Sequence, residues 1–216
     1  MLTIMNSGGV AMTNCFLLVD ETTRQAVLFD APDHTVEPLL DDAAKNGYDL
    51  VGLWLTHGHF DHFADHALVR KRFPSAKILL HSLDEPKARL PEAQTRMFQL
   101  PFVIPPLKAD SQVSDGQALQ IGSVEVKVLH TPGHSPGHVC YHLPGEKVLV
   151  GGDLIIGGSV GRTDLPDSRH ADLEASIRRV MQLPEDTRLL GGHGPVTTLG
   201  EERRRNPYVR SILESR

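Results

Sequence analysis

Short apolar runs separated by polar turns fill the first third of the chain. The runs NCFLLVDE and QAVLFDAP lie on either side of the turn ETTR, which predicts two paired strands. Residues 34–49, HTVEPLLDDAAKNGYD, place apolar side chains at helical spacing and end in Asn46-Gly47, a typical helix stop. VGLWLTH is a continuous apolar run of strand length, as expected for a strand that is covered on both faces. ADHALVRKRFP then predicts a short helix and AKILLH a second buried strand, an order that indicates a right-handed parallel crossover.

Residues 83–112 break this pattern, because they contain five prolines and no clean periodicity beyond a helical turn or two. We expect an irregular surface excursion here. The alternative is a lid beside an active site, since long loops in compact domains often have that function.

The second half returns to strands. QALQIG and SVEVKVLH are joined by the turn Gly122-Ser123, and CYHLPGEKVLVGGD repeats the design around Pro144-Gly145. SRHADLEASIRRVMQLP is predicted to be an amphipathic helix capped by Ser168 or Asp167. TRLLGGHG is a further strand, and GEERRRNPYVRSILESR closes the chain with a helix. Two sheet-rich halves, each flanked by helices, predict an α/β (α+β) fold with two sheets between helical layers.

Length and composition narrow the class of protein. A chain of 216 residues, 40% hydrophobic and 23% charged, fits a single globular domain over residues 1–216. The net charge of −5 gives no basic surface for nucleic acid, and no apolar run approaches a membrane span. The N-terminus does not read as a secretory signal, and Cys15 and Cys140 are expected to be buried free thiols. These features favour a cytoplasmic protein.

Histidine is unusually frequent, with 12 copies, and several polar side chains share one kind of position. Each comes just after a predicted strand: His57, His134, Asp153 and His193. Ligands of α/β proteins gather beyond the carboxyl ends of strands, so these four side chains are candidates for one site.

The loop THGHFDH adds more candidate ligands. His57 and His59 can face one centre from a single turn, while Asp61 and His62 can serve a second ion. Imidazole and carboxylate without thiolate suit Zn, Fe, Mn, Co or Ni better than Ca or Mg. Two metals that share a water need a bridging carboxylate, and Asp153 is taken as the only acid at a strand end. The pattern predicts a hydrolytic metal site.

The remaining histidines are expected to be ordinary hydrogen-bonded residues: His34, His66, His81, His130, His142 and His170. His138, in SPGH directly after His134, is the exception. It is either such a residue or a support for a neighbouring metal ligand.

The pattern His57-x-His59-x-Asp61-His62 followed by His134, Asp153 and His193 resembles the metallo-β-lactamase-fold hydrolases. This resemblance implies a four-layer αββα sandwich of two mixed sheets between helices. HTPGHSPGHVCY, GGDLIIGGSVGRTDLP and GHGPVTTLGEERRRNPYV look like the short, single-domain bacterial form of the glyoxalase II (hydroxyacylglutathione hydrolase) branch.

The resemblance implies two divalent metal ions, with Zn favoured and Fe or Mn as alternatives. Asp153 would bridge them, and a bridging hydroxide positioned by Asp61 would attack the thioester of an S-acylglutathione such as S-lactoylglutathione. The remaining ligands would divide between the ions: His57, His59 and His134 for the first, and Asp61, His62 and His193 for the second.

The chain departs from full-length glyoxalase II, which adds a helical C-terminal domain that supplies basic residues for glutathione. Here only residues 194–216 follow His193, so no separate substrate-binding domain is expected. Arg162 of GRTD is the candidate for substrate binding, and an ion pair with Asp164 or Asp167 is the competing expectation.

Other functions stay open. A GRTD stretch also occurs in persulfide dioxygenases, which resemble this chain and bind one iron through two His and one Asp. Hydrolysis of another ester, lactone or β-lactam is a third possibility, and a non-enzymatic metal-binding module is a fourth. All of the enzymatic alternatives imply a small-molecule substrate, with neither nucleic acid nor membrane as partner. The sequence leaves the oligomeric state open.

Overall fold

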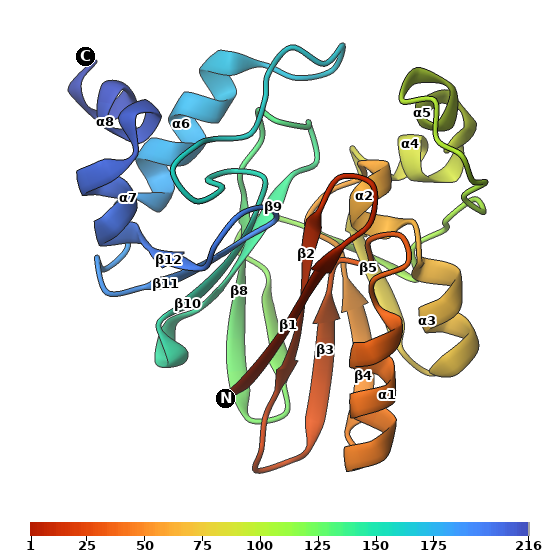
Figure 1. Ribbon diagram of the computed structural model, residues 1–216. Coiled ribbons are helices and arrows are strands. Elements are labelled where there is room, and N and C mark those ends of the chain that lie inside the picture. Colours follow the sequence, from red (N-terminus) through yellow and green to blue (C-terminus); the bar gives the residue numbers. More distant parts are fainter. Residues whose placement is uncertain (216) are drawn as a thin grey trace. The chain divides into compact units, whose positions relative to one another are not determined.

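A computed structural model describes residues 1–215 of the chain, which divides into two compact units. The first unit comprises Met1–Val113 with Gln120–Val124, and the second comprises Ser114–Leu119 with Glu125–Arg216. Two six-stranded sheets run through them. Their strands are drawn as arrows in Figure 1. That the whole chain acts as one domain stays a prediction.

The first sheet has the order β1-β2-β3-β4-β5-β6. Its first three strands pair antiparallel, and β3 to β6 pair parallel, so the sheet is mixed. The parallel pairing of β4 with β5 confirms the crossover expected from the apolar runs. The strands are β1 (Leu2–Gly8), β2 (Thr13–Val19), β3 (Gln25–Phe29), β4 (Asp49–Trp54), β5 (Lys77–His81) and β6 (Ser111–Val113).

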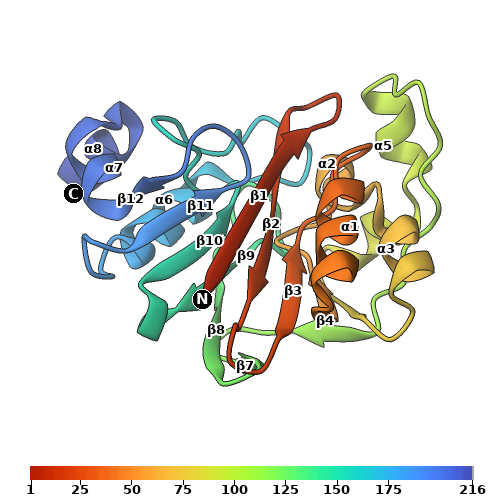
Figure 2. The same ribbon diagram turned by 60° about the horizontal axis from the view of Figure 1, so that its bottom comes forward.

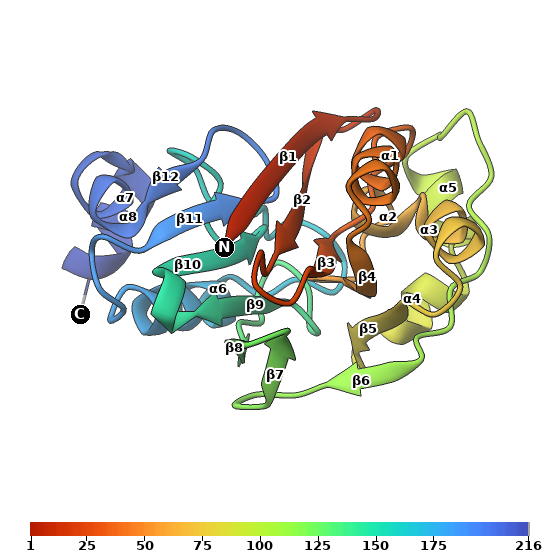
Figure 3. The ribbon, with the colours of Figure 1, turned by 90° about the horizontal axis from the view of Figure 1, so that it is seen from below.

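Helices α1 (Glu37–Asn46) and α3 (His66–Arg72) lie beside this sheet, as Figure 3 shows, with the single turn α2 (Phe60–Phe63) between them in sequence. Leu39 and Leu40 of α1 and Val69 of α3 pack into one buried cluster with inward side chains of the strands. The helix stop is confirmed at Gly47, whose φ of 64° closes α1 in the left-handed conformation.

Residues 83–112 are more ordered than expected. They form two short helices, α4 (Glu85–Arg89) and α5 (Glu92–Met97), and their last residues enter β6. The helices were not visible as a periodic pattern because each is only one or two turns long. The chain from α5 to β6 then runs past α3 (Figure 2).

The second sheet has the order β12-β11-β10-β9-β8-β7. Strands β8, β9 and β10 pair antiparallel, β10 pairs parallel with β11, and β12 adds an antiparallel edge. The strands are β7 (Ala118–Ile121), β8 (Val124–His130), β9 (Val139–Leu143), β10 (Val148–Gly152), β11 (Arg188–Gly191) and β12 (Thr197–Thr198), with a 3-10 turn at Pro144–Glu146.

Three helices cover this sheet: α6 (His170–Val180), α7 (Leu199–Arg205) and α8 (Pro207–Glu214). Leu173 and Ile177 of α6 and Val209 of α8 pack in one cluster with Leu149 and Leu189 of the strands. The predicted helix cap is wrong, because α6 begins after Arg169 and no side chain caps it. The hydroxyl of Ser168 instead donates to the carbonyl oxygen of Leu165 at 2.7 Å.

Both sheets are mixed and both are flanked by helices, which confirms the predicted fold class. Cys15 and Cys140 are buried and form no disulfide, as expected. Among residues 1–215, no helix is long and apolar enough to span a membrane.

Candidate metal centre

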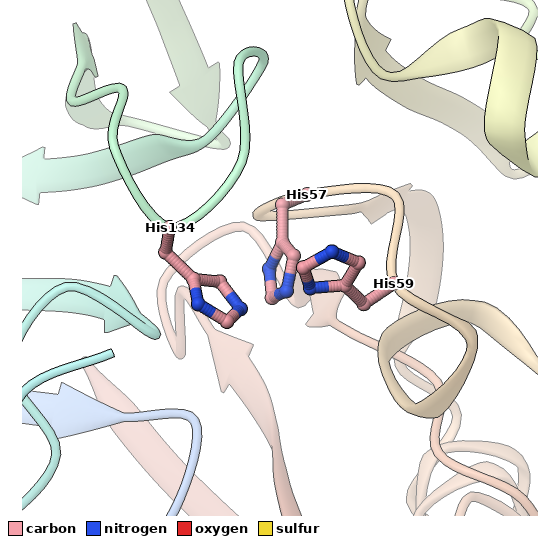
Figure 4. Close-up of side chains that lie close together, drawn as sticks. All are labelled: His57, His59 and His134. Carbon is pink, nitrogen blue, oxygen red and sulfur yellow. The ribbon is translucent and has the colours of Figure 1, made fainter. Parts of the chain in front are cut away.

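Four of the predicted ligands leave the loop that follows β4, and the structure brings them together within the first unit. The His57 ring lies 4.7 Å from the His59 ring and 4.0 Å from the His62 ring, measured between centroids. Nε2 of His62 is 3.5 Å from Oδ2 of Asp61. All four side chains are buried. Figure 4 draws two of them, His57 and His59, where they leave this loop, together with His134 from the second unit.

Asp30, the residue after β3, organises these histidines. Its Oδ2 accepts hydrogen bonds from Nδ1 of His62 and from the Thr56 hydroxyl, both at 2.8 Å, while Oδ1 accepts from the Thr56 amide. Parallel strands β3 and β4 end at the same edge of the sheet, which is why the three residues meet. The assumption that Asp153 is the only strand-end acid was therefore wrong, since QAVLFD also ends in one.

These contacts determine which imidazole nitrogen is offered as a ligand. The Thr56 hydroxyl donates a hydrogen bond to Asp30. Its oxygen, 3.0 Å from Nδ1 of His57, therefore accepts a hydrogen bond from that nitrogen. His62 likewise has its proton on Nδ1, facing Asp30. Both rings then carry the lone pair on Nε2, the tautomer in which metal-binding histidines are usually held.

Asp61 is positioned from the other side. The hydroxyl of Thr13, at the start of β2, donates to Oδ2 of Asp61 at 2.7 Å, and both residues are buried. A hydroxyl donor at this distance fixes the orientation of the carboxylate.

The segment that sequence analysis assigned to a surface excursion supports the ligand loop. Oδ2 of Asp84 accepts from the Gly58 amide at 2.8 Å. Gln94 makes two contacts with this loop, since Oε1 accepts from the Phe60 amide at 2.9 Å and Nε2 donates to the Gly58 carbonyl at 3.0 Å. Asp84 and Gln94 are buried although the segment around them is largely exposed. We call these two residues the brace of the ligand loop; a lid function for the segment stays a prediction.

The other three predicted ligands meet within the second unit. Oδ2 of Asp153 lies 3.5 Å from Nε2 of His134 and 3.3 Å from Nε2 of His193. Asp153 and His193 follow the parallel strands β10 and β11, whose Gly152 and Gly191 are paired. His193 is the most open of the three side chains, with 24% of its surface exposed.

The loop that contains GRTD holds His134 through its backbone. The carbonyl oxygen of Arg162 lies 2.9 Å from Nδ1 of His134, which again leaves Nε2 as the ligand atom. Gly161 lets the loop come this close, because a side chain there would collide with the carbonyl oxygen of Asp153 and press against Cβ of His134.

The side chain of Arg162 points elsewhere. Its Nε and Nη2 donate to the two carboxylate oxygens of Asp164, each at 2.6 Å, and both side chains are mostly in solvent. The hydrogen bonds from Arg162 lower the pKa of Asp164 to about 2. The structure thus has the ion pair that competed with substrate binding in the sequence analysis, and substrate binding by Arg162 stays a prediction.

His138 is fully buried and contacts the backbone of Asp153. Its Nε2 accepts from the Asp153 amide at 3.0 Å, so its proton is on Nδ1, which faces the Thr131 hydroxyl at 2.8 Å. Since the Nε2 lone pair is occupied in this contact, His138 lies beside the candidate ligands and is not offered as one.

The histidines expected to be ordinary residues have ordinary contacts. Nε2 of His130 lies 2.8 Å from the Pro136 carbonyl, and His170 pairs with Glu174 on the surface of α6. Burial lowers the pKa of His66 and of His142, which favours their neutral forms.

The residues present suit divalent transition metals. The donor set is five imidazoles and two carboxylates with no thiolate, a combination that suits these ions better than Ca or Mg. Three of the rings have Nδ1 engaged by a carboxylate, a hydroxyl or a carbonyl, an arrangement typical of metal-binding histidines.

Comparison with known families bears directly on this donor set. The sequence model of one protein family, the metallo-beta-lactamase superfamily, matches residues 8–193, which is most of the chain. The chain belongs to this superfamily. Its members are generally hydrolases that bind divalent metals, so the resemblance read from the motifs is confirmed.

Relatives of similar extent support the assignment. Hydroxyacylglutathione hydrolase GloC of Haemophilus influenzae is 31% identical over 207 residues, which cover 92% of this chain and 93% of that protein. The structure of BLEG-1 B3 metallo-beta-lactamase is 35% identical with a TM-score of 0.88, and covers 96% of this chain and 99% of that one.

Two further structures have the same fold. TTHA1623 in a di-iron-bound form is 36% identical with a TM-score of 0.84, over 96% of this chain and all of that one. ETHE1 from Myxococcus xanthus is 28% identical with a TM-score of 0.79, over 98% of this chain and 85% of that one.

Proposed function

We propose that the protein is a metal-dependent thioesterase that hydrolyses S-acylglutathione, with S-lactoylglutathione as the representative substrate. The observation that carries this proposal is the similarity to GloC, which is named as a hydroxyacylglutathione hydrolase and matches the chain over 93% of its own length. The match leaves little of that relative outside the aligned region, so its name belongs to the part that the two proteins share.

In this proposal two divalent ions, most simply Zn, occupy the donor set. His57, His59 and His134 would hold the first, Asp61, His62 and His193 would hold the second, and Asp153 would be a ligand shared by both. The support from the structure is separate for each unit: buried donors within contact distance, and rings oriented through Nδ1. The di-iron form of TTHA1623 makes iron an alternative metal.

Two bound metals would polarise the thioester carbonyl and lower the pKa of a shared water. The residues of the chain then have three tasks. Asp30 and the Arg162 carbonyl keep the histidine rings in the ligating tautomer. Asp61, held by Thr13, orients the attacking water through its carboxylate. His138 supports Asp153 by accepting its amide proton. In the reaction the acyl carbon gains a water oxygen, the carbon–sulfur bond breaks, and glutathione leaves as the thiolate.

Metal content and turnover test this proposal together. We expect two metals per chain and hydrolysis of S-lactoylglutathione. Asp153→Ala and His134→Ala should each abolish activity and lower the metal content, because each removes a ligand. His170→Ala is the matched control, since this histidine lies in the same unit but is exposed and pairs with Glu174. Full stoichiometry and rate in either ligand variant would disprove the site.

A second candidate is hydrolysis of a β-lactam, which is favoured by 35% identity to a structure named as a B3 metallo-beta-lactamase. Turnover of a chromogenic cephalosporin in preference to S-lactoylglutathione would select it. The persulfide dioxygenase reaction is a further alternative, because the GRTD stretch also occurs in those enzymes. One iron per chain, with oxygen consumed on addition of glutathione persulfide, would replace the thioesterase proposal.

A further inference from the structure

A cavity of about 600 Å³ lies in the first unit, between α3 and the proline-rich segment that leads into β6. One wall is the face of α3 that contains His66, Arg70 and Lys71, and the other contains Pro105 and Pro106. None of the residues that line it is among the seven proposed metal ligands. Figure 2 shows how the segment after α5 passes α3 before it enters β6.

The two walls are fastened to each other. His66 is only 5% exposed, and its Nδ1 lies 3.0 Å from the carbonyl oxygen of Phe63. The ring also lies against the backbone of Pro106 across the cavity. The buried ring of His66 therefore lies between the helix and the proline wall, and the cavity is part of the folded unit.

A second contact holds a cation at the rim. Oδ2 of Asp110 accepts a hydrogen bond from the Ile78 amide at 2.8 Å. The same oxygen accepts a hydrogen bond from Nη2 of Arg70 at 3.0 Å. The carboxylate is thus anchored to β5, and it in turn orients the guanidinium. Holding a guanidinium in advance reduces the side-chain entropy that is lost when a ligand binds.

The lining has an excess of positive charge. Arg70, Lys71 and Lys108 face one carboxylate, Asp110, which leaves a net charge of about +2 in a chain whose total is −5. Lys71 and Lys108 are exposed, and within residues 1–215 no carboxylate lies in ion-pair distance of either ammonium. A concentration of cations in a hollow attracts anions of matching charge.

We propose that this cavity binds a phosphate monoester, with the dianionic phosphate on Arg70, Lys71 and Lys108 and the organic group against Pro105 and Pro106. Arginine matches phosphate oxygens with its planar set of donors, and lysine adds point charges. Two adjoining proline rings offer an apolar surface for the organic group. The net charge of the lining matches a dianion better than a single carboxylate.

The zinc-loaded full chain, labelled with ¹⁵N, is titrated with phenyl phosphate and, separately, with inorganic phosphate. Saturable shifts of the amides of Ala67, Lys71 and Lys108 are expected, with tighter binding of phenyl phosphate because of the proline wall. Lys71→Gln/Lys108→Gln should weaken the binding about tenfold. Lys45→Gln/Lys127→Gln removes the same charge from exposed positions elsewhere and should change the affinity less than about twofold.

The proposal would be overturned if only the amides of the proposed metal ligands shifted. It would also be overturned if the Lys71/Lys108 variant bound phenyl phosphate as tightly as the wild-type chain does. Equal losses in the two double variants would also overturn it, because only the total charge would then matter. Sedimentation with vesicles that contain phosphatidic acid distinguishes the source of the phosphate. Cosedimentation that is lost in the Lys71/Lys108 variant assigns a lipid headgroup, while saturable phenyl phosphate binding without cosedimentation assigns a soluble ester.

Discussion

Replacing His138 tests how the second unit holds Asp153, the proposed bridging carboxylate. In His138→Ala the Asp153 amide loses its acceptor at 3.0 Å, and the Thr131 hydroxyl loses its partner at 2.8 Å and keeps only the Cys140 thiol at 3.4 Å. His138 and Thr131 are fully buried and Asp153 nearly so, which means that water does not readily replace the ring. The substitution therefore acts on both the free energy of unfolding and the position of Asp153.

The magnitude follows from these contacts. Each buried polar group that loses its partner costs about 1–3 kcal/mol, and the space left by the ring adds about 2 kcal/mol. Because the groups belong to one network, the terms do not add fully. We expect His138→Ala to lower the free energy of unfolding by about 3–5 kcal/mol, a large share of the roughly 5–15 kcal/mol that stabilises a typical domain.

Urea unfolding of the metal-free protein, followed by circular dichroism, measures this loss without a contribution from metal binding. His138→Gln is the matched variant, because its Oε1 can replace Nε2 as acceptor for the Asp153 amide. It should lose only about 1–2 kcal/mol, for the contact with Thr131. Competition with a chelator adds a second measurement. We expect about 10- to 100-fold weaker zinc binding in the Ala variant and recovery of most of it in the Gln variant.

Three results would refute this reasoning. A loss below about 1 kcal/mol in His138→Ala would mean that the two hydrogen bonds stabilise little. A Gln variant no better than Ala would show that the acceptor to Asp153 is not the important contact. Unchanged zinc affinity in a destabilised Ala variant would make His138 purely structural.

Three other changes have defined outcomes. Burial raises the pKa of Cys15 and of Cys140 from 9.0 to about 12, so above pH 9 only the unfolded chain releases these protons. The free energy of unfolding should then fall with rising pH by up to about 1.4 kcal/mol per pH unit for each thiol, and Cys140→Ala should reduce that slope in urea titrations; an equal slope would contradict the assignment. Gly161→Ala should lower the free energy of unfolding by about 1–3 kcal/mol and weaken zinc binding, because the added methyl group displaces the loop from His134. Wild-type values of both quantities would rule out the close approach of the loop to His134. Arg162→Ala should leave the melting temperature and the zinc content unchanged, because the backbone carbonyl that holds His134 remains. In the same variant, NMR titration should show the pKa of Asp164 rising from about 2 toward its ordinary value. Loss of zinc would show that the Arg162 side chain is needed.

The strands and the candidate ligands could be predicted because both leave local signals. An apolar run that stops at a glycine or a histidine marks the end of a strand, and ligands collect at such ends. Asp153 and His193 illustrate this, since each follows a glycine-rich strand end and the two strands are parallel neighbours. Asp30 obeys the same rule and was overlooked because it ends an early strand that seemed only to pair with its neighbour.

The supporting contacts had no such signal. Gln94 lies in a segment without periodicity and reaches Gly58, 36 positions away, only once the chain has folded. The contact of Arg162 is made by its carbonyl, which every residue possesses, so the side chain misdirected the prediction. Contacts of the backbone, and contacts between distant irregular segments, depend on tertiary placement that single-sequence patterns do not encode.

The brace formed by Asp84 and Gln94 links the opening of two segments of the first unit. The Gly58 and Phe60 amides are held by side chains from residues 83–97, so their protons exchange with solvent only when those side chains release them. The ligand loop and the two short helices therefore form one cooperative opening unit. The stability of this unit depends partly on helices α4 and α5, which contribute no proposed ligand. Proteolytic cleavage or a substitution in that segment would therefore make the loop with the histidines unfold locally more often.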